Sequence, residues 1–514
     1  MKRQSTIRGA TYITIGRILS KIIGVFRERL FAVYFGTSYV IDVFKLGIAI
    51  FGLITQAVIT PILRYASPNI TQAYEEEDFG HIKHNTQVIL LLAGSIGLLL
   101  SGLLMLFPKQ IIHWFLPYVY HDPAKLSIAS AMFVLIGLMS ALYVLITIFE
   151  QILVAINIYT HLGIKDPLIN TLWTTIVAVS PEALYIVWGR IFGALAYFIL
   201  VLYLTYKAFS YMKRHFTHKG APSRKALVKD IFVGTLPLYI GGSIAIINQF
   251  IDRTMAGYLG EGNIAMIGYG SVMAGIIGSL MIGPFVQSIY PKVSAYIRKN
   301  DKYGFLKEAH GITELVLFFS IPAVIGISTL TYRTAFFFFG SNKIGGNTLI
   351  TIGIIAAIMS YVQLLAASQI YTSAFIPMKR TDIGMKISLF VVPLNILLNY
   401  ILAFTMGMGA IGLKLATAIS VTIGNFTSLY ILSKLLGGLQ LRTLLPSTIK
   451  TLIASLAMVV FIYPLDKLLP QTRVFTLLII FIGATVYFMV AYIEGHEVLD
   501  RIIDKINSLF TFEE

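Results

Sequence analysis

Apolar stretches of about 20 residues recur along the whole chain, and each is long enough to cross the hydrocarbon of a bilayer as a helix. Short polar segments separate them. We expect about fourteen membrane-spanning helices, at residues 10–26, 40–63, 88–107, 126–158, 167–179, 184–204, 231–258, 264–289, 312–330, 349–375, 383–404, 411–436, 451–465 and 474–493. Hydrophobic residues make up 57% of the 514 and the mean hydropathy is +0.80, which leaves too little polar surface for a water-soluble globule. The sequence therefore predicts an all-α polytopic membrane protein.

The basic residues are concentrated in the loops that follow even-numbered helices. The chain has 40 lysines and arginines against 24 acidic residues, which gives a net charge of +16. The largest group follows the sixth expected helix: Lys207, Lys213, Arg214, Lys219, Arg224, Lys225 and Lys229. Because loops rich in Lys and Arg stay in the cytoplasm, we expect these loops and both termini to be cytoplasmic, in a multi-pass protein of the cytoplasmic (inner) membrane. This topology accounts for the basic surplus, so we expect no nucleic-acid partner.

The residue types and motifs that the sequence lacks narrow its chemistry. It has no cysteine, which excludes disulfides, thiolate metal sites and thiol nucleophiles. It has neither a G-x-x-x-x-G-K-[ST] phosphate-binding loop nor an H-E-x-x-H metal motif. We therefore expect no cofactor, no catalytic residue and no metal site, and transport driven by a coupling monovalent cation, the membrane potential or substrate supply. The charged opening helix lacks a cleavage site, so we expect it to be retained.

Two segments of the chain resemble each other. Residues 26–36 align with residues 250–260, with Phe, Arg, Ala, Tyr and Gly in common and Glu28 matched by Asp252. Chance similarity between apolar segments is the alternative, whereas a true repeat predicts two pseudo-symmetric six-helix lobes with the substrate between them. The expected divisions of the chain are a first lobe at 1–212, a basic cytoplasmic linker at 213–229, a second lobe at 230–437, and two further helices with a cytoplasmic tail at 438–514.

Ionisable side chains inside expected helices mark the first lobe. Such groups are costly at bilayer depth and normally face a protein interior or a water-filled cavity. The candidates for binding an anionic group, with phosphate the leading one, are Arg17, Lys21, Arg27, Arg29 and Asp42. Two alternatives stay open. Arg27 and Arg29 reach the lipid headgroups or pair with Glu28, and Asp42 serves only as the counter-ion of Lys21.

Amide side chains mark the second lobe instead. Asn395 and Asn399 stand at i and i+4 beside Pro393, so they share one helix face. We interpret them as a candidate site for a small monovalent cation, with hydrogen bonding between helices as the alternative.

The segments at 20–28 (SKIIGVFRE) and 34–42 (YFGTSYVID) resemble the opening signature of the lipid II flippases (MviN-type), a family of the multidrug/oligosaccharidyl-lipid/polysaccharide (MOP) superfamily. The resemblance implies the same helix count and transport by alternating access. In that mechanism a lipid-linked, pyrophosphate-bearing saccharide enters a basic cavity from the cytoplasmic leaflet and leaves on the outer face. The resemblance also implies that Lys21, Arg27 and Asp42 are charged cavity residues.

The chain departs from the family pattern at three places. The stretch 45–56 has no arginine where the family has one in the second helix, and Ser271 stands where the family has an arginine in the eighth. Asn395 and Asn399 replace the carboxylates of the cation site proposed for that family. The identity of the substrate and of the coupling ion both depend on these positions.

We expect a flippase, and not an enzyme, that moves lipid II or a related undecaprenyl-pyrophosphate-linked glycan from the inner to the outer leaflet. Its expected partners are this glycolipid and the membrane lipids, with the chain acting as a monomer. A multidrug/cation antiporter of the same superfamily is the first alternative, and it would need buried carboxylates, which the expected helices largely lack. A polytopic glycosyltransferase or ligase is the second. It would need a large external loop with acidic catalytic groups, whereas the loops at 109–125 and 333–347 are short.

Overall fold

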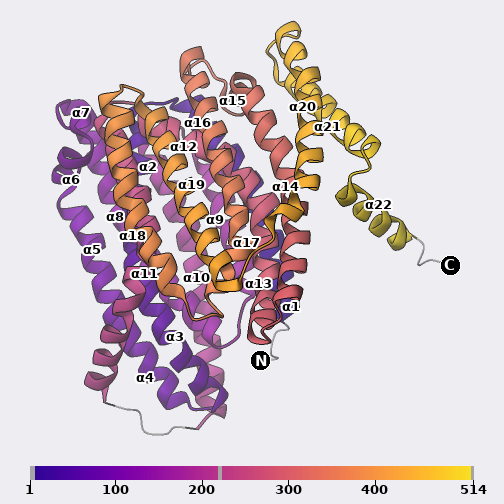
Figure 1. The fold of residues 1–514 in the computed structure, drawn as a ribbon. Coiled ribbons are helices and arrows are strands. Elements are labelled where there is room, and N and C mark those ends of the chain that lie inside the picture. Colours follow the sequence, from indigo (N-terminus) through magenta and orange to yellow (C-terminus); the bar gives the residue numbers. More distant parts are fainter. Residues whose placement is uncertain (1–5, 218–222, 511–514) are drawn as a thin grey trace. The chain divides into compact units, whose positions relative to one another are not determined.

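The computed structural model describes residues 6–217 and 223–510 of the chain. Within these residues the protein is built of helices, without a strand and with one isolated β-bridge between Asp78 and Thr217 (Figure 1). The chain divides into two compact units, Met1–Ala265 and Met266–Glu514. The expected all-α architecture is confirmed.

The first unit contains the helices up to α11 and the start of α12. Their bounds are α1 Thr6–Tyr34, α2 Tyr39–Gly52, η1 Leu53–Ile59, α3 Thr60–Glu75, α4 Phe79–Ile89, η2 Leu90–Gly94, α5 Ser95–Leu106, α6 Pro108–Phe115, α7 Pro117–Tyr120, α8 Pro123–Ala155, α9 Thr160–Val179, α10 Ala183–His215, α11 Arg224–Tyr258 and α12 Asn263–Ile277.

The second unit contains the remainder of α12 and all later helices. Their bounds are η3 Gly278–Ile282, α13 Gly283–Arg298, α14 Lys302–Thr329, α15 Thr331–Phe339, α16 Gly346–Leu365, η4 Ala366–Ser368, α17 Gln369–Thr372, η5 Ser373–Phe375, α18 Thr381–Asn399, η6 Tyr400–Thr405, α19 Gly409–Leu436, η7 Leu441–Leu444, α20 Leu445–Leu468, α21 Arg473–Ile493 and α22 Glu497–Phe510.

Eleven helical stretches of the described residues are long and apolar enough to cross a membrane. The other three expected spans, 10–26, 167–179 and 231–258, correspond to α1, α9 and α11. The protein is therefore a multi-pass membrane protein, while a total of about fourteen spans stays a prediction. The expected linker at 213–229 includes residues 218–222, which lie outside the described residues, and the division into lobes also stays a prediction.

Helix α9 is longer than its apolar run indicates. The expected span began at Pro167, because Lys165 and Asp166 interrupt the apolar pattern. In the structure the helix begins at Thr160 and includes both charges and the proline. A proline inside a helix removes one backbone hydrogen bond but does not always end the helix. The charges at the start of α9 are therefore placed on a helix that packs in the interior of the first unit.

Close helix packing brings α1, α9 and α10 together. Helix α9 contacts both α1 and α10 along most of its length. A Cβ atom added at Gly16 of α1 would lie 2.0 Å from the carbonyl oxygen of Gly163 in α9. One added at Gly193 of α10 would lie 2.8 Å from the carbonyl oxygen of Ile169. Only glycine permits backbones to approach this closely, and the approach directs polar side chains of the three helices into a shared space.

A π-helical turn interrupts the second helix of each half of the chain. It lies at Leu53–Ile59 in the first half and at Gly278–Ile282 in the second. Such turns insert an extra residue into the helix and are frequent at functional sites. The first of them, η1, contributes Thr55 and Gln56 to the cavity described below.

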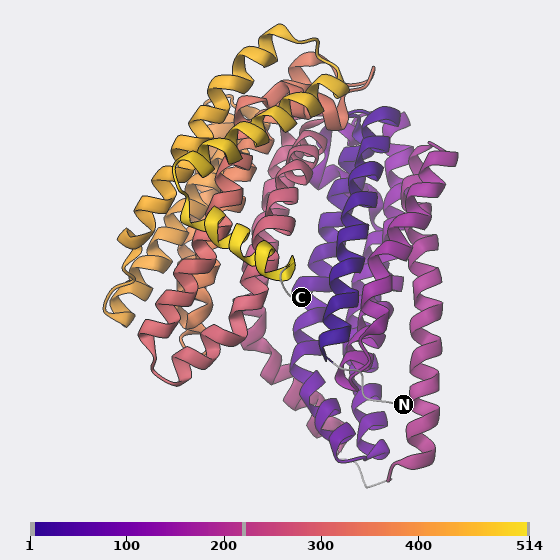
Figure 2. The same ribbon diagram turned by 90° about the vertical axis from the view of Figure 1, so that its right-hand side faces the viewer.

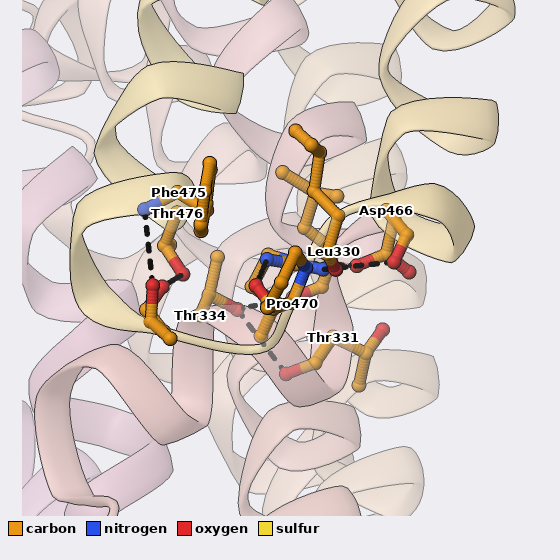
Figure 3. Close-up of polar contacts among 10 residues, drawn as sticks. Leu330, Thr331, Thr334, Asp466, Pro470, Phe475 and Thr476 are labelled. Carbon is orange, nitrogen blue, oxygen red and sulfur yellow. Dashed lines mark hydrogen bonds and ion pairs between the residues drawn. The ribbon is translucent and has the colours of Figure 1, made fainter.

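A fully buried arginine fixes α15 to the turn between α20 and α21. Two of its partners on that turn, Asp466 and Pro470, are labelled in Figure 3. Arg333 is 0% exposed, and its Nε donates to Oδ1 of Asp466 at 2.6 Å. The guanidinium also donates to the carbonyl oxygens of Pro470 at 3.0 Å, Asp466 at 2.8 Å and Leu469 at 2.8 Å. One side chain therefore satisfies the carbonyl groups left open where α20 ends.

Helices α20 and α21 run side by side as a hairpin, and α22, yellow in Figure 2, leads away from the end of α21. Their buried core includes Met458, Ile479 and Tyr487, together with Phe318 of α14. His496 lies at the junction of α21 and α22. It is 0% exposed, and its ring contacts that of Phe318 in this core.

Candidate functional site: a cationic cavity in the first unit

A cavity of about 410 Å³ lies inside the first unit. It is enclosed by α1, α2, η1, α3, α8, α9 and α10. The lining residues are Arg27, Phe51, Thr55, Gln56, Thr60, Tyr143, Thr147, Glu150, Lys165, Asp166, Ile169, Asn170, Trp173 and Arg190. Three cationic and two anionic side chains therefore share the wall with neutral polar groups and aromatic rings.

Arg27 of α1 is held on one side of this cavity. Its Cζ lies 3.8 Å from the centroid of the Trp173 ring, a cation–π contact, and its Nη1 donates to Oδ1 of Asn170. The guanidinium also lies 3.5 Å from Oε1 of Glu28. Its Nε is buried without a hydrogen-bond partner among the described residues. Arg27 is thus positioned by α9 and still has a donor to offer.

The spacing of residues along two helices explains this arrangement. Ser20 and Arg27 are seven residues apart, or about two helical turns, so both face α9. The amide of Asn170 bridges them, because its Nδ2 donates to Oγ of Ser20 at 2.6 Å and its Oδ1 accepts from Arg27. On α9, Asn170 and Trp173 stand at i and i+3 and face the same partner helix.

Arg190 of α10 contacts the same indole as Arg27. Its Cζ is 5.0 Å from the ring of Trp173, 5.5 Å from that of Phe51 and 5.4 Å from that of Tyr143. Its Nε donates to the hydroxyl of Tyr143 at 3.4 Å. No acidic side chain in the described part of the chain forms an ion pair with Arg190. Aromatic rings orient this cation, and no carboxylate neutralises it.

Lys165 differs from Arg190 because it already has a counter-ion. Its Nζ lies 2.8 Å from Oε2 of Glu150, whose other oxygen accepts from the hydroxyl of Tyr197 at 2.6 Å. Glu150 is 8% exposed, so the pair is largely withdrawn from water. The rest of the wall near η1 and α8 carries the neutral side chains of Thr55, Gln56, Thr60 and Thr147.

The sequence-predicted cations occupy different positions along α1. Arg27 lines the cavity, whereas Arg17 and Lys21 are exposed on the helix surface and Arg29 is half-buried. Of the described residues, none forms a hydrogen bond or ion pair with Lys21. Glu28 lies between Arg27 and Lys45, with its Oε2 2.7 Å from Nζ of Lys45. The alternative in which Arg27 pairs with Glu28 is therefore present in the geometry, alongside the contacts of Arg27 to α9.

Asp42 lies outside the cavity wall and is fully buried. Its carboxylate accepts hydrogen bonds from the hydroxyl of Tyr118 at 2.6 Å, the backbone N–H of Gly262 at 2.6 Å and that of Ala265 at 2.7 Å. Burial, together with the neighbouring Asp42 carboxylate, raises the pKa of the Tyr118 phenol, so this hydroxyl stays protonated and donates. These three donors, and not Lys21, are the hydrogen-bond partners of Asp42.

Asn395 and Asn399 are brought together on α18 of the second unit. They are 1% and 0% exposed, and Nδ2 of Asn399 donates to Oδ1 of Asn395 at 3.2 Å. This hydrogen bond lies within α18 and does not join two helices. Cation binding and the alternative, hydrogen bonding between helices, therefore both stay predictions. Among the described residues, no group of three or more His, Cys, Asp or Glu side chains is placed to hold a metal ion.

Arg190, Lys165 and Glu150 are cavity residues that the sequence reasoning missed. A signal for Arg190 was present, because it is a single charge inside the apolar run at 184–204, and such charges normally mark functional interiors. Lys165 was excluded from its helix by the apolar-run criterion. Glu150 lies near the end of the expected span 126–158, where an interfacial position was equally consistent with the sequence.

Comparisons with known proteins agree with one another. The family model described as "Lipid II flippase MurJ" matches residues 31–483. A solved structure of lipid II flippase MurJ in an inward closed conformation superposes with a TM-score of 0.75, at 20% identity, over 95% of this chain and 99% of that chain.

Two more distant structural neighbours belong to the same superfamily. An inward-facing multidrug resistance MATE family transporter of the MOP superfamily gives a TM-score of 0.65 at 13% identity, over 84% of this chain and 99% of that one. A MOP superfamily transporter from Pyrococcus furiosus gives a TM-score of 0.55 at 13% identity, over 84% of this chain and 96% of that one. A search of curated proteins gave no significant match. The family model covers most of the sequence, and the chain belongs to the lipid II flippase MurJ family.

Proposed function

We propose that this chain translocates lipid II from the inner to the outer leaflet of the cytoplasmic membrane by alternating access. Family membership supports the substrate, and the observation in this chain that supports it best is the cationic cavity around Arg27. Lipid II carries a pyrophosphate between its isoprenoid chain and its saccharide. Guanidinium groups bind such oxyanions through paired, charge-assisted hydrogen bonds.

Each predicted site residue has a distinct role in this proposal. Arg27 binds the pyrophosphate, because its Nε and its position on Trp173 leave it facing the cavity. The exposed Arg17 and Lys21, with Arg29, form a cationic track along α1 that attracts the headgroup. Asp42 holds α2 to the turn at Gly262 and to the start of α12. It does not contact the substrate, since a carboxylate repels a phosphate.

Orientation and energy source complete the proposal. Both termini lie in the cytoplasm and the chain works as a monomer. Translocation is driven by the membrane potential or by a monovalent cation bound near Asn395 and Asn399, whose amide oxygens are suitable ligands for such an ion. Reporters fused within residues 213–225 test the orientation, because a cytoplasmic reading is expected and an external reading would reverse the proposed direction of transport.

The antiporter alternative has one observation in its favour. Glu150 is a buried carboxylate in the cavity wall, as a cationic cargo would require. Lys165 already neutralises that carboxylate at 2.8 Å, and the remaining wall is more basic than acidic. Lipid II translocation is therefore favoured.

Depletion complementation tests the proposal. The chain is expressed in a bacterium whose own lipid II flippase is switched off, and growth is scored. Rescue is expected, and it should be lost in Lys21→Ala and Arg27→Ala while membrane insertion stays intact. Arg64→Ala serves as the control, because Arg64 is an exposed arginine on α3 that does not line the cavity. Failure of the well-expressed wild type would exclude lipid II and leave another lipid-linked saccharide as the substrate.

A further inference from the structure

We propose that Arg190 is the second guanidinium of the pyrophosphate site, and that it binds one phosphoryl group while Arg27, which contacts the same indole of Trp173, binds the other. This inference rests on the proposed function, because it assigns a further substrate-binding residue to the same cavity. It commits the site to a diphosphate rather than to a single phosphate.

Arg190 is incompletely coordinated. Its guanidinium makes one long hydrogen bond to Tyr143 and contacts three aromatic rings. A guanidinium has five N–H donors, so most of them are left for a ligand. Lys165 in the same wall is neutralised by Glu150, whereas Arg190 has no such carboxylate among the described residues.

The neighbour of Arg190 in the cavity, Arg27, carries a like charge. Arg27 and Arg190 contact the same indole, and their charges repel each other. Two cations held close together away from bulk water are unfavourable unless an anion offsets them. Glu28 compensates only part of this charge, because it is shared between Arg27 and Lys45. A dianionic group bound between the two guanidiniums relieves the repulsion.

Aromatic packing makes the pair a fixed receptor. Trp173 is 3% exposed and contacts Phe31 and Phe44, so its ring cannot rotate freely. A Cβ atom added at Gly189 would lie 2.8 Å from Cδ1 of this ring, which shows how tightly α10 packs on it. Two guanidiniums on a fixed ring lose little conformational entropy on binding, and such preorganisation favours affinity.

The remaining wall fits the rest of the same ligand class. Thr55, Gln56, Thr60 and Thr147 add neutral donors and acceptors beside the cations, and α2 and η1 contribute no cation. Neutral polar groups of this kind suit the hydroxyl and amide groups of a saccharide. The combined site is therefore specific for a glycan attached to a diphosphate.

Binding measurements on the full chain in lipid nanodiscs test this assignment. The probes are lipid II, undecaprenyl pyrophosphate, undecaprenyl phosphate and undecaprenol, which share one lipid and differ in charge. Arg190→Gln is expected to weaken binding of both diphosphates roughly ten- to hundredfold, to weaken the monophosphate less, and to leave undecaprenol unchanged. Arg190→Lys keeps the charge but loses the planar fork, so an intermediate loss for the diphosphates is expected.

Arg214→Gln is the matched control, because Arg214 is an exposed arginine on the same helix α10, and its binding should equal that of the wild type. Equal weakening of undecaprenol, or unchanged diphosphate binding in Arg190→Gln, would overturn the inference. If Arg190→Gln does not fold, Arg190→Lys decides the question. The inference is then contradicted if Arg190→Lys loses no more affinity for the diphosphates than for the monophosphate, each measured against the wild type. If the wild type binds undecaprenyl pyrophosphate but not lipid II, the proposed function fails while the role of Arg190 stands.

Discussion

Two arginines, Arg190 on α10 of the first unit and Arg333 on α15 of the second, use the same side chain in opposite ways. Arg333 is fully buried, pairs with Asp466 and donates to three backbone carbonyl groups. Arg190 faces a cavity, contacts three aromatic rings and makes one long hydrogen bond. A saturated guanidinium stabilises the fold, whereas an unsaturated one that aromatic rings hold in place is ready to bind an anion. The number of satisfied donors, and not burial alone, separates the two roles.

The largest effect on stability is expected for Arg333→Met. Removing one partner of a buried ion pair leaves Asp466 and the carbonyl groups at the end of α20 without donors, which costs about 3–5 kcal/mol. Chemical unfolding of the purified protein measures this change. Arg298→Met, at the exposed end of α13, is the control and should lie within about 0.5 kcal/mol of the wild type. A stable Arg333→Met protein would mean that these contacts do not hold α15 to the α20–α21 turn.

A smaller loss of stability is expected when the indole ring of Trp173, which contacts both cavity arginines, is displaced. Gly189→Ala places a methyl group 2.8 Å from Cδ1 of Trp173, and overpacking of this kind costs about 1–3 kcal/mol. The shift of the ring should also weaken lipid II binding. Gly102→Ala in α5 is the matched control, because nothing lies within 4 Å of its added methyl group. The Gly102→Ala protein should be as stable as the wild type or more stable, since alanine favours helix. Equal stability of Gly102→Ala and Gly189→Ala would contradict a tightly held Trp173.

Glu150→Gln should raise the affinity of the cavity for an anion. The substitution removes one of the two negative charges of the wall and leaves Lys165 without its counter-ion. Coulombic attraction for a pyrophosphate then rises by about 1 kcal/mol, or roughly fivefold in affinity. Titration of undecaprenyl pyrophosphate at low ionic strength measures it. Weaker binding in Glu150→Gln would indicate that Glu150 contacts the substrate, as in the antiporter alternative.

The smallest expected effect is a dependence of the packing of α22 on pH. It arises at His496, at the junction of α21 and α22 in the second unit. Nδ1 of His496 accepts from the N–H of Val498 at 3.3 Å, so its Nε2 donates to the carbonyl oxygen of Ser447 at 3.1 Å. Burial, and to a lesser degree Lys450, lowers the pKa of His496 below its ordinary value of 6.5. A lowered pKa means that the undocked segment binds the proton more readily. Helix α22 packs on α14, where Val498 joins the core around Phe318 and Arg501 forms an ion pair with Glu314. This packing is therefore fully stable above about pH 6.5 and weakens as the pH falls below it.

Hydrogen exchange of α22 at pH 7.5 and pH 5 measures this dependence, with faster exchange expected at pH 5. His496→Gln keeps a hydrogen-bonding side chain that does not titrate, so its exchange should differ between the two pH values only by the intrinsic chemical rate. The same acceleration in that variant would assign the effect to another group.

The sequence was a good guide to helices and a partial guide to the site, for physical reasons. Apolar runs are a local property, so the segments that became α8 and α21 were found at nearly their full length. Interior charges break such runs, and for that reason α9 was started too late and Lys165 was missed. Partners far apart in the chain, such as Asn170 for Arg27 or Gly262 for Asp42, depend on how helices pack, and no local pattern encodes them.

The family resemblance and the geometry of the cavity pointed to different residues. The opening motif indicated the family and therefore the substrate class, which the family model supports over residues 31–483. It pointed to Lys21, Arg27 and Asp42 but carried no information about Arg190, which became a candidate only when the cavity and its missing counter-ion were seen. A lone arginine within an apolar run is the sequence signal to examine first in related chains.

The most direct test of the account measures lipid II affinity and unfolding free energy side by side for Arg190→Gln and Arg333→Met. The account predicts that Arg190→Gln loses affinity while its stability stays near that of the wild type. It predicts that Arg333→Met loses stability while its folded fraction binds lipid II with wild-type affinity. If Arg190→Gln instead loses stability and keeps its affinity, Arg190 is a structural residue and the cavity is not the pyrophosphate site described here.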